Sequence, residues 1–390
     1  MPRHFLFLQG LPGPSFRMLA QALRKQGCHT SRINLNGGDW LDWRIGNATA
    51  YRGSANGWAD WLRQYLTQNA VTDIVLFGEL RPRHHMAISL AAELGMQLFE
   101  FEEGYLRPNH VTIQRWIAGH RCEAGTGLDP TAPEMPVAAS FKRRMRESTL
   151  YWIATTVTRP WYRHYQSHRI YPAWLEMLYW CRRRIRRVSE KAYSRAAVEA
   201  IGNHPFFLFP LQLDGDAQIV GRSSFASMKH ALDMVIASFV HHAPADTFLL
   251  IKRHPFDPDI ADWAAQIREL GGQWAVADRV RYVARYDLEP LLERCCGVVL
   301  VNSTVGPLAL AKGKAVYAMG QAIYARHGLT HHGPLDDFWR QPQSPEAGAF
   351  QQFTADLKMQ SQVNGGFHSD AALEQLVSSA MSVLLAQRQS

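Results

Sequence analysis

The sequence has little of what marks secreted, membrane-spanning or zinc-binding proteins. Its five cysteines are scattered and form no CxxC pair, which fits a reducing compartment and argues against a zinc site. No uncharged stretch approaches the roughly 18–20 residues that a membrane-spanning helix needs. Residues 1–16 hold only a short apolar run and lack the hydrophobic region and cleavage site of a signal peptide. We therefore expect a cytoplasmic protein.

Motifs for common cofactors and metals are also missing. LQGLPGP, at Leu8 to Pro14, is rich in glycine and proline but is neither a GxGxxG fingerprint nor a P-loop. There is no HExxH motif and no EF-hand loop, and the pairs His84–His85 and His331–His332 lack convincing ligand spacing. We expect no cofactor and no metal ion.

What the chain does have is an ordinary globular composition and one strongly basic segment. Hydrophobic residues make up 47% and charged residues 19% of its 390 residues, enough for a large core and about two domains. The net charge is +8, yet fourteen Lys or Arg stand against three Glu between Lys142 and Arg195. The basicity therefore belongs to that segment, and the remainder is slightly acidic.

Short apolar runs alternate with amphipathic stretches in both halves of the chain. The expected strands are residues 4–8, 29–34, 73–77, 97–101, 206–209, 248–251, 297–301 and 315–317. The expected helices are residues 16–26, 58–66, 86–94, 228–240, 260–270, 288–294 and 371–386. This rhythm predicts an α/β fold with two Rossmann-like domains and a cleft between them.

Four parts follow from this pattern. Residues 1–138 are expected to form an N-terminal Rossmann-like domain, and residues 199–340 a C-terminal Rossmann-like domain. Residues 139–198 are expected to form a basic, aromatic, helical insertion. Residues 341–390 are expected to be C-terminal helices that return to the first domain.

The basic insertion has an amphipathic character of its own. Apolar residues fall at helical spacing on one stripe, at Trp174, Leu178, Cys181, Ile185 and Val188. Basic residues flank that stripe, at Arg182, Arg183, Arg186 and Arg187. A basic amphipathic helix with aromatic residues suits an anionic membrane surface, which we favour. Nucleic acid is a competing partner, and a helical hairpin with a solvated charged face is the plain alternative.

An acidic pair stands in the middle of the chain, in FPLQLDGDAQI. Asp214 and Asp216 follow the apolar run of residues 206–208, where a second α/β half begins. Ligands bind at the carboxyl edge of open α/β sheets, and a carboxylate there can act as nucleophile or base. The alternative is a simple turn, since Asp and Gly favour turns.

FEEGYLRPNH follows another expected strand. Glu102 and Glu103 are adjacent carboxylates, Gly104 permits a tight turn, and Arg107 supplies a cation. Such a carboxylate can take a proton from an attacking hydroxyl, and Arg107 can bind an acidic group in bidentate fashion. The alternative is an ordinary Glu–Arg pair on a surface loop.

Two further segments leave strands with groups that suit an anion. IKRHPFDP gathers positive charge and donors, at Lys252, Arg253, His254 and Pro255. VNSTVGPLALAKG is a strand, a small polar turn and a helix, with candidate residues Asn302, Ser303, Thr304 and Gly306. Free N–H groups at a helix N-terminus bind phosphate, although Ser and Thr are also ordinary helix caps.

Taken in order, these segments resemble the bacterial capsule β-Kdo transferases of the KpsS type, called LipB in some capsule systems. FLQGLPGPSF with RINLNGGDW looks like the opening of that family, and FEEGYLR is similar to an element shared with the KpsC type. QLDGDAQI is similar to a Q-x-x-x-D-A element, and KRHP and NSTVG look like the pair that holds the nucleotide. The chain departs from the KpsC pattern at Gln218, where Ser is usual, and in having a single transferase module.

The resemblance implies a GT-B-like fold and transfer of Kdo from CMP-Kdo with retention of configuration. The acceptor would be phosphatidylglycerol or its lyso form, which receives the first β-linked Kdo of the capsule anchor. Asp216 would be the nucleophile, with Asp214 the second choice, and Glu103 or Glu102 would deprotonate the acceptor hydroxyl. Gln212 and Gly10 would also bind substrate.

The remaining roles follow from the same resemblance. The phosphate of the donor would be stabilised by Lys252, His254 and the helix end at Ser303, Thr304 and Gly306. Arg107 or Arg253 would offset the carboxylate of Kdo. The basic aromatic segment would hold the enzyme on the inner membrane surface, with other capsule biosynthesis proteins as further partners and no nucleic acid.

Two other functions stay open on the sequence. One is a GT-B enzyme that uses a different nucleotide sugar. The other is a non-catalytic, lipid-bound factor for capsule assembly or export.

Overall fold

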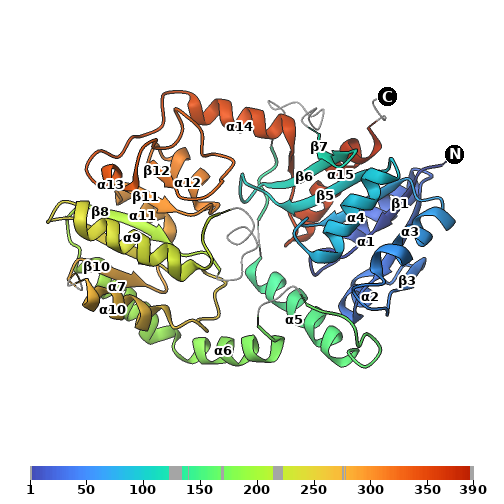
Figure 1. The fold of residues 1–390 in the computed structure, drawn as a ribbon, viewed down its shortest axis with the longest axis horizontal. Helices are drawn as coiled ribbons and strands as arrows, with labels where there is room; N and C mark the ends of the chain where they lie inside the picture. The colour runs from blue at the N-terminus through green and yellow to red at the C-terminus, as the bar shows by residue number, and fades with distance from the viewer. Residues whose placement is uncertain are drawn as a thin grey trace. The chain divides into compact units, whose positions relative to one another are not determined.

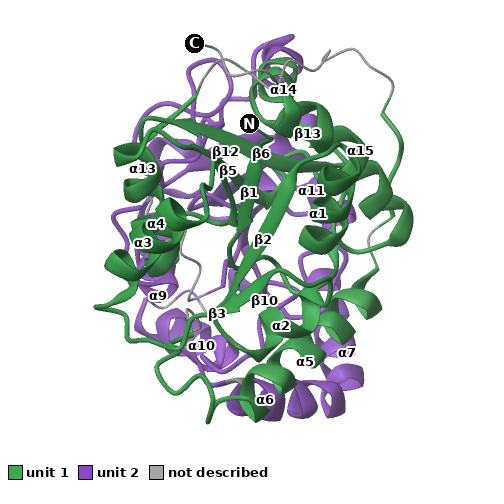
Figure 2. Cartoon of the chain, turned by 90° about the vertical axis from the view of Figure 1, so that its right-hand side faces the viewer, with its two compact units in different colours: residues 1–168, 354–390 green, residues 169–353 purple. Residues whose placement is uncertain are grey.

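The structure is a computed structural model that describes residues 2–122, 134–138, 140–167, 171–213, 223–274, 276 and 278–386. The chain divides into two compact units, coloured separately in Figure 2. Unit 1 comprises residues 1–168 and 354–390, and unit 2 comprises residues 169–353. Each unit has a wholly or largely parallel sheet with helices packed on it, which confirms the predicted α/β class.

Unit 1, whose helices and strands are drawn in Figure 1, is built on a largely parallel sheet. Its strand order is β13-β6-β5-β4-β1-β2-β3, with β7 paired to β6. Its strands are β1 (His4–Phe7), β2 (His29–Asn34), β3 (Ala48–Ala50), β4 (Asp73–Phe77), β5 (Gln97–Glu103), β6 (His110–Ile117), β7 (His120–Arg121) and β13 (Gln362–Asn364). Its helices are α1 (Ser15–Lys25), α2 (Gly37–Trp43), α3 (Trp58–Gln68), α4 (Pro82–Glu93), α5 (Phe141–Val157) and α15 (Asp370–Leu385).

Unit 2 has a fully parallel sheet of order β10-β9-β8-β11-β12. Its strands are β8 (Phe206–Pro210), β9 (Phe248–Lys252), β10 (Val280–Val283), β11 (Gly297–Leu300) and β12 (Ala315–Ala318). Its helices are α6 (Ala173–Ile185), α7 (Arg187–Glu199), α9 (Met228–His242), α10 (Trp263–Gln273), α11 (Leu288–Arg294), α12 (Val305–Ala311) and α13 (Leu335–Phe338), while α14 (Ala349–Gln360) crosses the boundary between the units.

Both sheets share the topology of a doubly wound nucleotide-binding fold. In chain order within each unit, the five parallel strands lie 3-2-1-4-5, the Rossmann arrangement. Unit 1 adds β6 and β13 as antiparallel strands beyond β5. The two Rossmann-like units are the components of the predicted GT-B-like fold. Each has a switch point where the strand order reverses, between β1 and β4 in unit 1 and between β8 and β11 in unit 2.

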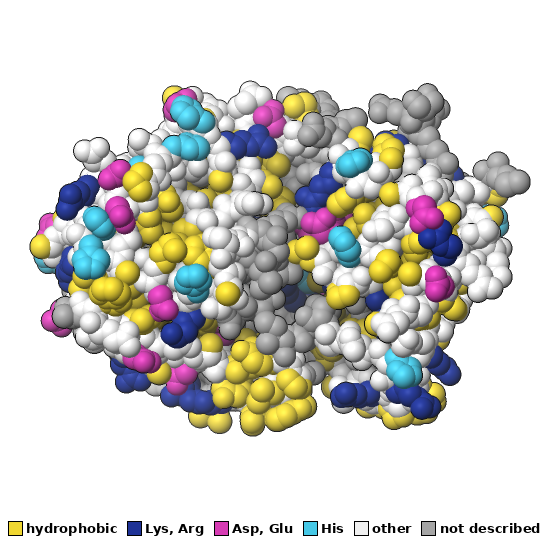
Figure 3. Space-filling view, viewed as in Figure 1, with side chains coloured by type: hydrophobic (Ala, Val, Ile, Leu, Met, Phe, Trp, Pro, Cys, Tyr) yellow, Lys and Arg dark blue, Asp and Glu magenta, His cyan; other side chains and the backbone are white. Residues whose placement is uncertain are grey.

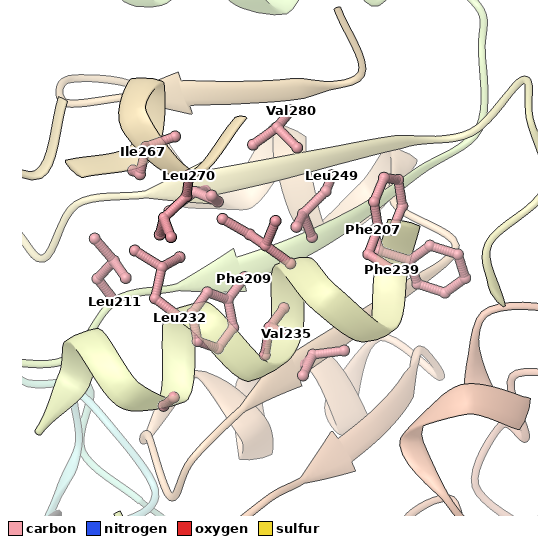
Figure 4. Close-up of a cluster of buried hydrophobic side chains, with 14 of the residues drawn as sticks. Phe207, Phe209, Leu211, Leu232, Val235, Phe239, Leu249, Ile267, Leu270 and Val280 are labelled. Atoms are coloured by element: carbon pink, nitrogen blue, oxygen red, sulfur yellow. The ribbon is translucent and has the colours of Figure 1, made fainter. Parts of the chain in front are cut away.

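Central strands such as β4 and β8 are nearly continuous apolar runs because helices cover both faces of the sheets. In β4, Ile74, Val75 and Leu76 are fully buried. In unit 2, side chains from β8 and β9 interdigitate with those of α9 and α10, as Figure 4 shows. This core comprises, among others, Phe207, Phe209, Leu232, Val235, Phe239, Leu249, Ile267 and Leu270.

The predicted insertion, residues 139–198, is divided between the two units. Helix α5 packs on α2 in unit 1, whereas α6 and α7 belong to unit 2. Two glycines of the NLNGGDW segment allow the α5 contact, because a Cβ on Gly37 would lie 2.0 Å from Thr158 Oγ1 and one on Gly38 would lie 2.5 Å from the Tyr151 ring. Near the chain's end, α15 packs on α1.

Tyr151 fixes α5 from inside unit 1. Its hydroxyl donates to Asp39 Oδ1 at 2.9 Å and accepts from Gln9 Nε2 at 2.8 Å and Asn36 Nδ2 at 3.0 Å. Arg32 also donates to Asp39 Oδ1, at 3.0 Å. All five side chains are buried. This part of the predicted membrane segment is therefore an integral part of the first α/β core.

Candidate functional site

Two loops meet at the switch point of unit 2, where β8 ends at Pro210 and β11 ends at Leu300. Gln212 Nε2 donates to Asn302 Oδ1 at 2.8 Å, and the backbone N of Asn302 donates to Gln212 Oε1 at 3.0 Å. Gln212 is buried. Because ligands of open α/β sheets bind outside the carboxyl ends of strands at such a point, these two predicted residues form the centre of the candidate site.

The KRHP segment begins at Lys252, the last residue of β9, and continues beyond that strand, which lies next to β8 at the same sheet edge. Lys252 is nearly buried, and burial followed by the charge of Arg253 lowers its pKa to about 8. His254 Nδ1 accepts a hydrogen bond from Phe256 N at 3.1 Å, so the neutral ring carries its proton on Nε2. Pro255 is exposed. The segment thus supplies an ammonium group and an imidazole N–H donor beside the switch point.

Arg253 has a different environment from the one predicted for it. It is 1% exposed, and its terminal nitrogens pair with Glu190 Oε2 at 2.7 Å and Asp259 Oδ2 at 2.8 Å. Arg285 pairs with the same Glu190 oxygen at 2.9 Å. Two carboxylates already satisfy the guanidinium charge, so the geometry supports a role in holding the KRHP loop and does not support direct contact with substrate.

The NSTVG segment begins α12, a helix of seven residues. Ser303 Oγ accepts from Val305 N at 3.2 Å, and Tyr324 OH donates to Ser303 O at 2.5 Å. Thr304 is the N-cap residue without a capping bond from its side chain. A Cβ on Gly306 would lie 2.3 Å from the Tyr324 ring, so close packing requires glycine there. Ser303 stabilises the local turn, and its hydroxyl can also donate a hydrogen bond to a ligand.

The predicted nucleophile lies outside this description. Asp214 and Asp216 fall in residues 214–222, beyond the residues that the structure describes. Gln212 and Leu213 are the last described residues before that gap. The roles of both aspartates stay predictions.

The FEEGYLR segment lies in unit 1, and its glutamates are part of the strand. Because β5 runs to Glu103, two residues beyond its predicted end, Glu102 and Glu103 point to opposite faces of the sheet. A Cβ on Gly104 would lie 2.0 Å from His110 O, so the chain turns tightly into β6 only with glycine. The two glutamates therefore cannot act together at one site, because each places its carboxylate on a different face of the sheet.

Glu103 is tied to basic side chains. Its oxygens pair with Arg107 and with Arg144 of α5, at 2.7 Å each, and His368 Nε2 lies 3.8 Å away. Burial alone would raise the pKa of Glu103, but Arg107, His368 and Arg144 outweigh it and hold the pKa well below its usual range. For Arg107 the sequence left two roles open, binding an acidic substrate group or pairing with a glutamate, and the structure contains the pair. Nothing in the sequence pointed to Arg144 or His368, which are distant in the chain.

Glu102 shares its face with Glu100, which sequence reasoning missed. Glu100 is buried and accepts from Glu79 N at 2.7 Å and from Trp116 Nε1 at 3.0 Å. Burial, and then the charge of Glu102, raise the pKa of Glu100 to about 8. The signal available was a carboxylate in the interior of an apolar strand, LFEFEE, which is rare without a special environment.

Gly10 lies at the switch point of unit 1, in the loop after β1. Arg81, from the loop after β4, donates to Gly10 O at 3.2 Å and to Gln9 O at 3.4 Å. A Cβ on Gly10 would lie 2.9 Å from the Phe16 ring. Packing therefore accounts for glycine at this position, and its substrate contact stays a prediction.

Exposed apolar side chains gather on α5 and α6, each within its own unit. On α5 they are Phe141, Leu150, Ile153 and Val157. On α6 and at the start of α7 they are Trp174, Met177, Leu178, Ile185 and Val188. Figure 3 shows such a yellow group at the lower edge, with dark blue basic side chains beside it, where Figure 1 places α6. The described residues include no helix long and apolar enough to cross a membrane.

Comparison with known proteins matches the chain to one family. The family described as "Capsule polysaccharide biosynthesis protein" matches residues 72–368. The chain is 30% identical over 379 residues to the capsule polysaccharide export protein KpsS of Escherichia coli, covering 94% of this chain and 97% of that protein. It is 28% identical over 384 residues to the capsule polysaccharide modification protein LipB of Neisseria meningitidis serogroup B, covering 94% and 92%.

Solved structures give weaker matches. The Thermosulfurimonas dismutans KpsC β-Kdo 2,7 transferase has a TM-score of 0.46 at 13% identity, covering 99% of this chain and 100% of that chain. A glycosyltransferase from Rickettsia africae has a TM-score of 0.41 at 10% identity, with the same coverage.

Proposed function

This chain belongs to the capsule polysaccharide biosynthesis protein family, and from that premise we propose that it is a retaining glycosyltransferase that uses CMP-Kdo. The proposed acceptor is phosphatidylglycerol or its lyso form, which receives the first β-Kdo of the capsule lipid anchor. The curated relatives carry names that refer to capsule polysaccharide export and modification. The ordered segments FEEGYLR, QLDGDAQI, KRHP and NSTVG support Kdo as the sugar.

The observation that carries the proposal is the pair of loops at the unit 2 switch point. Gln212 and Asn302 hold each other through two hydrogen bonds. Lys252 is the last residue of β9 and His254 follows that strand, which lies next to β8 in the sheet. A cation and an N–H donor at this edge are what a nucleotide phosphate requires. CMP is a good leaving group once its phosphate charge is stabilised.

The reaction that we propose has two displacements. Asp216 attacks the anomeric carbon of Kdo, and the bond from that carbon to the phosphate oxygen breaks, so CMP leaves with the electron pair. The acceptor hydroxyl then attacks the same carbon and displaces Asp216, while its proton passes to a carboxylate base. Two inversions at one carbon give net retention.

We propose Glu102 as that base. Glu103 is neutralised by Arg107 and Arg144, and a carboxylate whose pKa is held low is a poor proton acceptor. Arg107, with 39% of its side chain exposed, is then the cation that offsets the carboxylate of Kdo. Arg253 is the less suitable cation, because it is buried and pairs with two carboxylates, Glu190 and Asp259, whereas Arg107 is partly exposed and pairs with one.

The lipid acceptor accounts for the exposed apolar faces. Trp174 and Ile185 of α6 are 65% and 84% exposed, and Arg182, Arg186 and Arg187 are exposed beside them. Apolar insertion together with basic side chains favours an anionic bilayer, where each basic residue contributes about 1 kcal/mol. We therefore propose peripheral binding to the inner face of the cytoplasmic membrane.

The test is CMP release in the presence of CMP-Kdo and phosphatidylglycerol vesicles. The wild-type protein should release CMP over many turnovers only when both are present. With CMP-Kdo alone it should release at most one CMP per enzyme, and mass spectrometry should then detect a Kdo adduct on the peptide that contains Asp216. Asp216→Ala should reduce turnover by at least about 10³-fold, as expected for loss of a nucleophile, while circular dichroism stays unchanged. Normal turnover by a folded Asp216→Ala protein contradicts the mechanism.

A further inference from the structure

Helix α6 is attached to unit 2 in an unusual way. Among the side chains of α6 that the structure describes, Arg183 is the buried one, at 5% exposure. Apolar residues of the same helix point to solvent instead, with Met177 at 56% and Leu178 at 59% exposed. An isolated helix of this length is marginal in water, so α6 depends on external contacts for its order.

Arg183 makes its contacts with the KRHP loop. Its NH1 donates to Pro255 O at 2.9 Å and to Asp257 O at 2.7 Å, and its guanidinium lies 4.8 Å from the centre of the Trp180 ring. These carbonyl groups lie one and three residues after His254. The side chain that fixes α6 is thus also a side chain that fixes the candidate phosphate-binding loop.

The neighbouring helix α7 is attached more firmly. Glu190 pairs with Arg253 and Arg285, and Ser194 Oγ accepts from the backbone N of Ala284 and of Arg285, at 3.0 Å each. Ser194, Ala197 and Val198 are buried. Helix α7 therefore holds one side of the KRHP loop in any environment. Helix α6 can hold the loop through Arg183 only when other contacts keep α6 itself in place.

We propose that α6 links membrane binding to donor binding, with Arg183 as the positioning residue. When the apolar stripe of α6 lies in an anionic bilayer, the helix is held and Arg183 fixes the carbonyl groups of Pro255 and Asp257. Lys252 and His254 are then ordered before the nucleotide arrives, and the nucleotide binds without the entropy loss of ordering them. The inference rests on the proposed function, because it places the donor phosphate at this loop.

An anionic bilayer is the occupant that the α6 surface fits. The stripe is aliphatic and aromatic, and the exposed arginines Arg182, Arg186 and Arg187 carry charge opposite to that of an acidic lipid headgroup. Linkage makes the effect reciprocal, so CMP should also strengthen binding to vesicles.

The experiment measures the affinity of the full-length protein for CMP by calorimetry, in buffer, with phosphatidylcholine vesicles, and with vesicles that contain phosphatidylglycerol. We expect phosphatidylglycerol vesicles to tighten CMP binding about tenfold, within the usual range of coupling between sites. Amide hydrogen exchange in residues 252–259 should slow under the same condition.

Three variants make the test specific. Arg183→Gln should still bind vesicles yet lose the tenfold effect, whereas Arg184→Gln, which removes the same charge from an exposed position, should keep it. Met177→Ser combined with Ile185→Ser should lose the effect through weaker vesicle binding, with CMP affinity in buffer unchanged. Thermal unfolding reports whether each variant is folded.

The outcomes separate this inference from the proposed function. CMP binding that vesicles do not change, or a vesicle effect that survives in Arg183→Gln, overturns the inference and leaves the proposed function intact. Absence of CMP binding in every condition contradicts the proposed donor instead. Self-association through the stripe without vesicle binding would make α6 an interface between copies and would also overturn the inference.

Discussion

Glu100 and Glu103 are three residues apart in β5 and have opposite electrostatic environments. Glu103 pairs with two arginines, and its pKa lies below its usual range. Glu100 is buried against Trp116 and the backbone of Glu79, and its pKa rises to about 8. The two carboxyl groups therefore make opposite contributions to the dependence of stability on pH.

The prediction for Glu100 is that its contribution to stability falls as the pH rises. Its folded pKa lies above the ordinary value of 4.5, so between about pH 4.5 and 8 the folded state binds more protons than the unfolded state. Glu100→Gln removes this titration. The variant should be about 1 kcal/mol less stable at pH 5, from a lost hydrogen bond, and should equal or exceed wild type at pH 8. Urea denaturation at both pH values measures the difference.

Glu103→Gln is the control, because the contribution of Glu103 to stability changes with pH in the opposite direction. A carboxyl group whose folded pKa is depressed contributes stability above its unfolded pKa and loses it as the pH falls. This variant should be less stable than wild type at neutral pH, and the difference should shrink below about pH 4. If wild type and Glu100→Gln differ in free energy of unfolding by the same amount at pH 5 and pH 8, the inference that Glu100 is neutral in the folded protein is wrong.

The candidate site shows what single residues in a sequence can and cannot reveal. KRHP, NSTVG and Gln212 were recognisable because polar groups follow apolar strands at one sheet edge. The pairing of Arg253 with Glu190 was not recognisable, because 63 residues separate the two and no local pattern indicates the partner. The same holds for Arg144 with Glu103. Ion pairs between distant segments decide which charged residues remain available to a ligand, and they depend on the packed fold.

At the scale of elements, local patterns predicted eight of the ten parallel strands among the described residues. They missed the parallel strands β3 and β10 and the antiparallel strands β6, β7 and β13. β13 has three residues and pairs with β6, Gln362 opposite Thr112 and Val363 opposite Val111. So short a segment carries no readable periodicity. Helix α5 was predicted as part of a separate basic insertion, because its arginines dominate the sequence. The contact that places it in unit 1 comes from the small residues of α2.

The prediction for the α2–α5 contact is that Gly38→Ala destabilises unit 1. The new methyl group would overlap the Tyr151 ring, with a Cβ only 2.5 Å from it, and would displace the hydroxyl that bonds to Gln9, Asn36 and Asp39. We expect a loss of about 2–4 kcal/mol from overpacking and broken buried hydrogen bonds. Thermal unfolding and the near-ultraviolet signal of Tyr151 and Trp152 measure it.

Gly272→Ala is the matched control. Gly272 lies in α10, and a Cβ there meets nothing within 4 Å. The same chemical change should therefore be neutral or stabilise by up to about 1 kcal/mol, since Ala is the better helix former. Equal effects of the two substitutions would show that the α2–α5 contact tolerates a side chain.

At the scale of the whole molecule, the chain has two Rossmann-like units with different side chains at their switch points. In unit 1, Arg81 spans the switch point and donates to the carbonyl groups of Gln9 and Gly10. In unit 2, the cross-bonded Gln212 and Asn302 lie beside Lys252 and His254. The proposal therefore assigns the donor nucleotide to unit 2 alone, which a ligand titration can test without any chemistry.

The prediction is that CMP stabilises the protein and that UDP and GDP do not. A ligand at 100 times its dissociation constant adds about 2.7 kcal/mol to the stability of the state that binds it. For a unit of this size that corresponds to a rise of roughly 5 °C or more in unfolding temperature. Gln212→Ala breaks both hydrogen bonds to Asn302, so it should abolish the CMP shift. The loss of these buried bonds should also lower the unfolding temperature without ligand by a few degrees. Stabilisation by UDP alone would assign the chain a different nucleotide sugar, and a full CMP shift in Gln212→Ala would place the nucleotide away from this switch point.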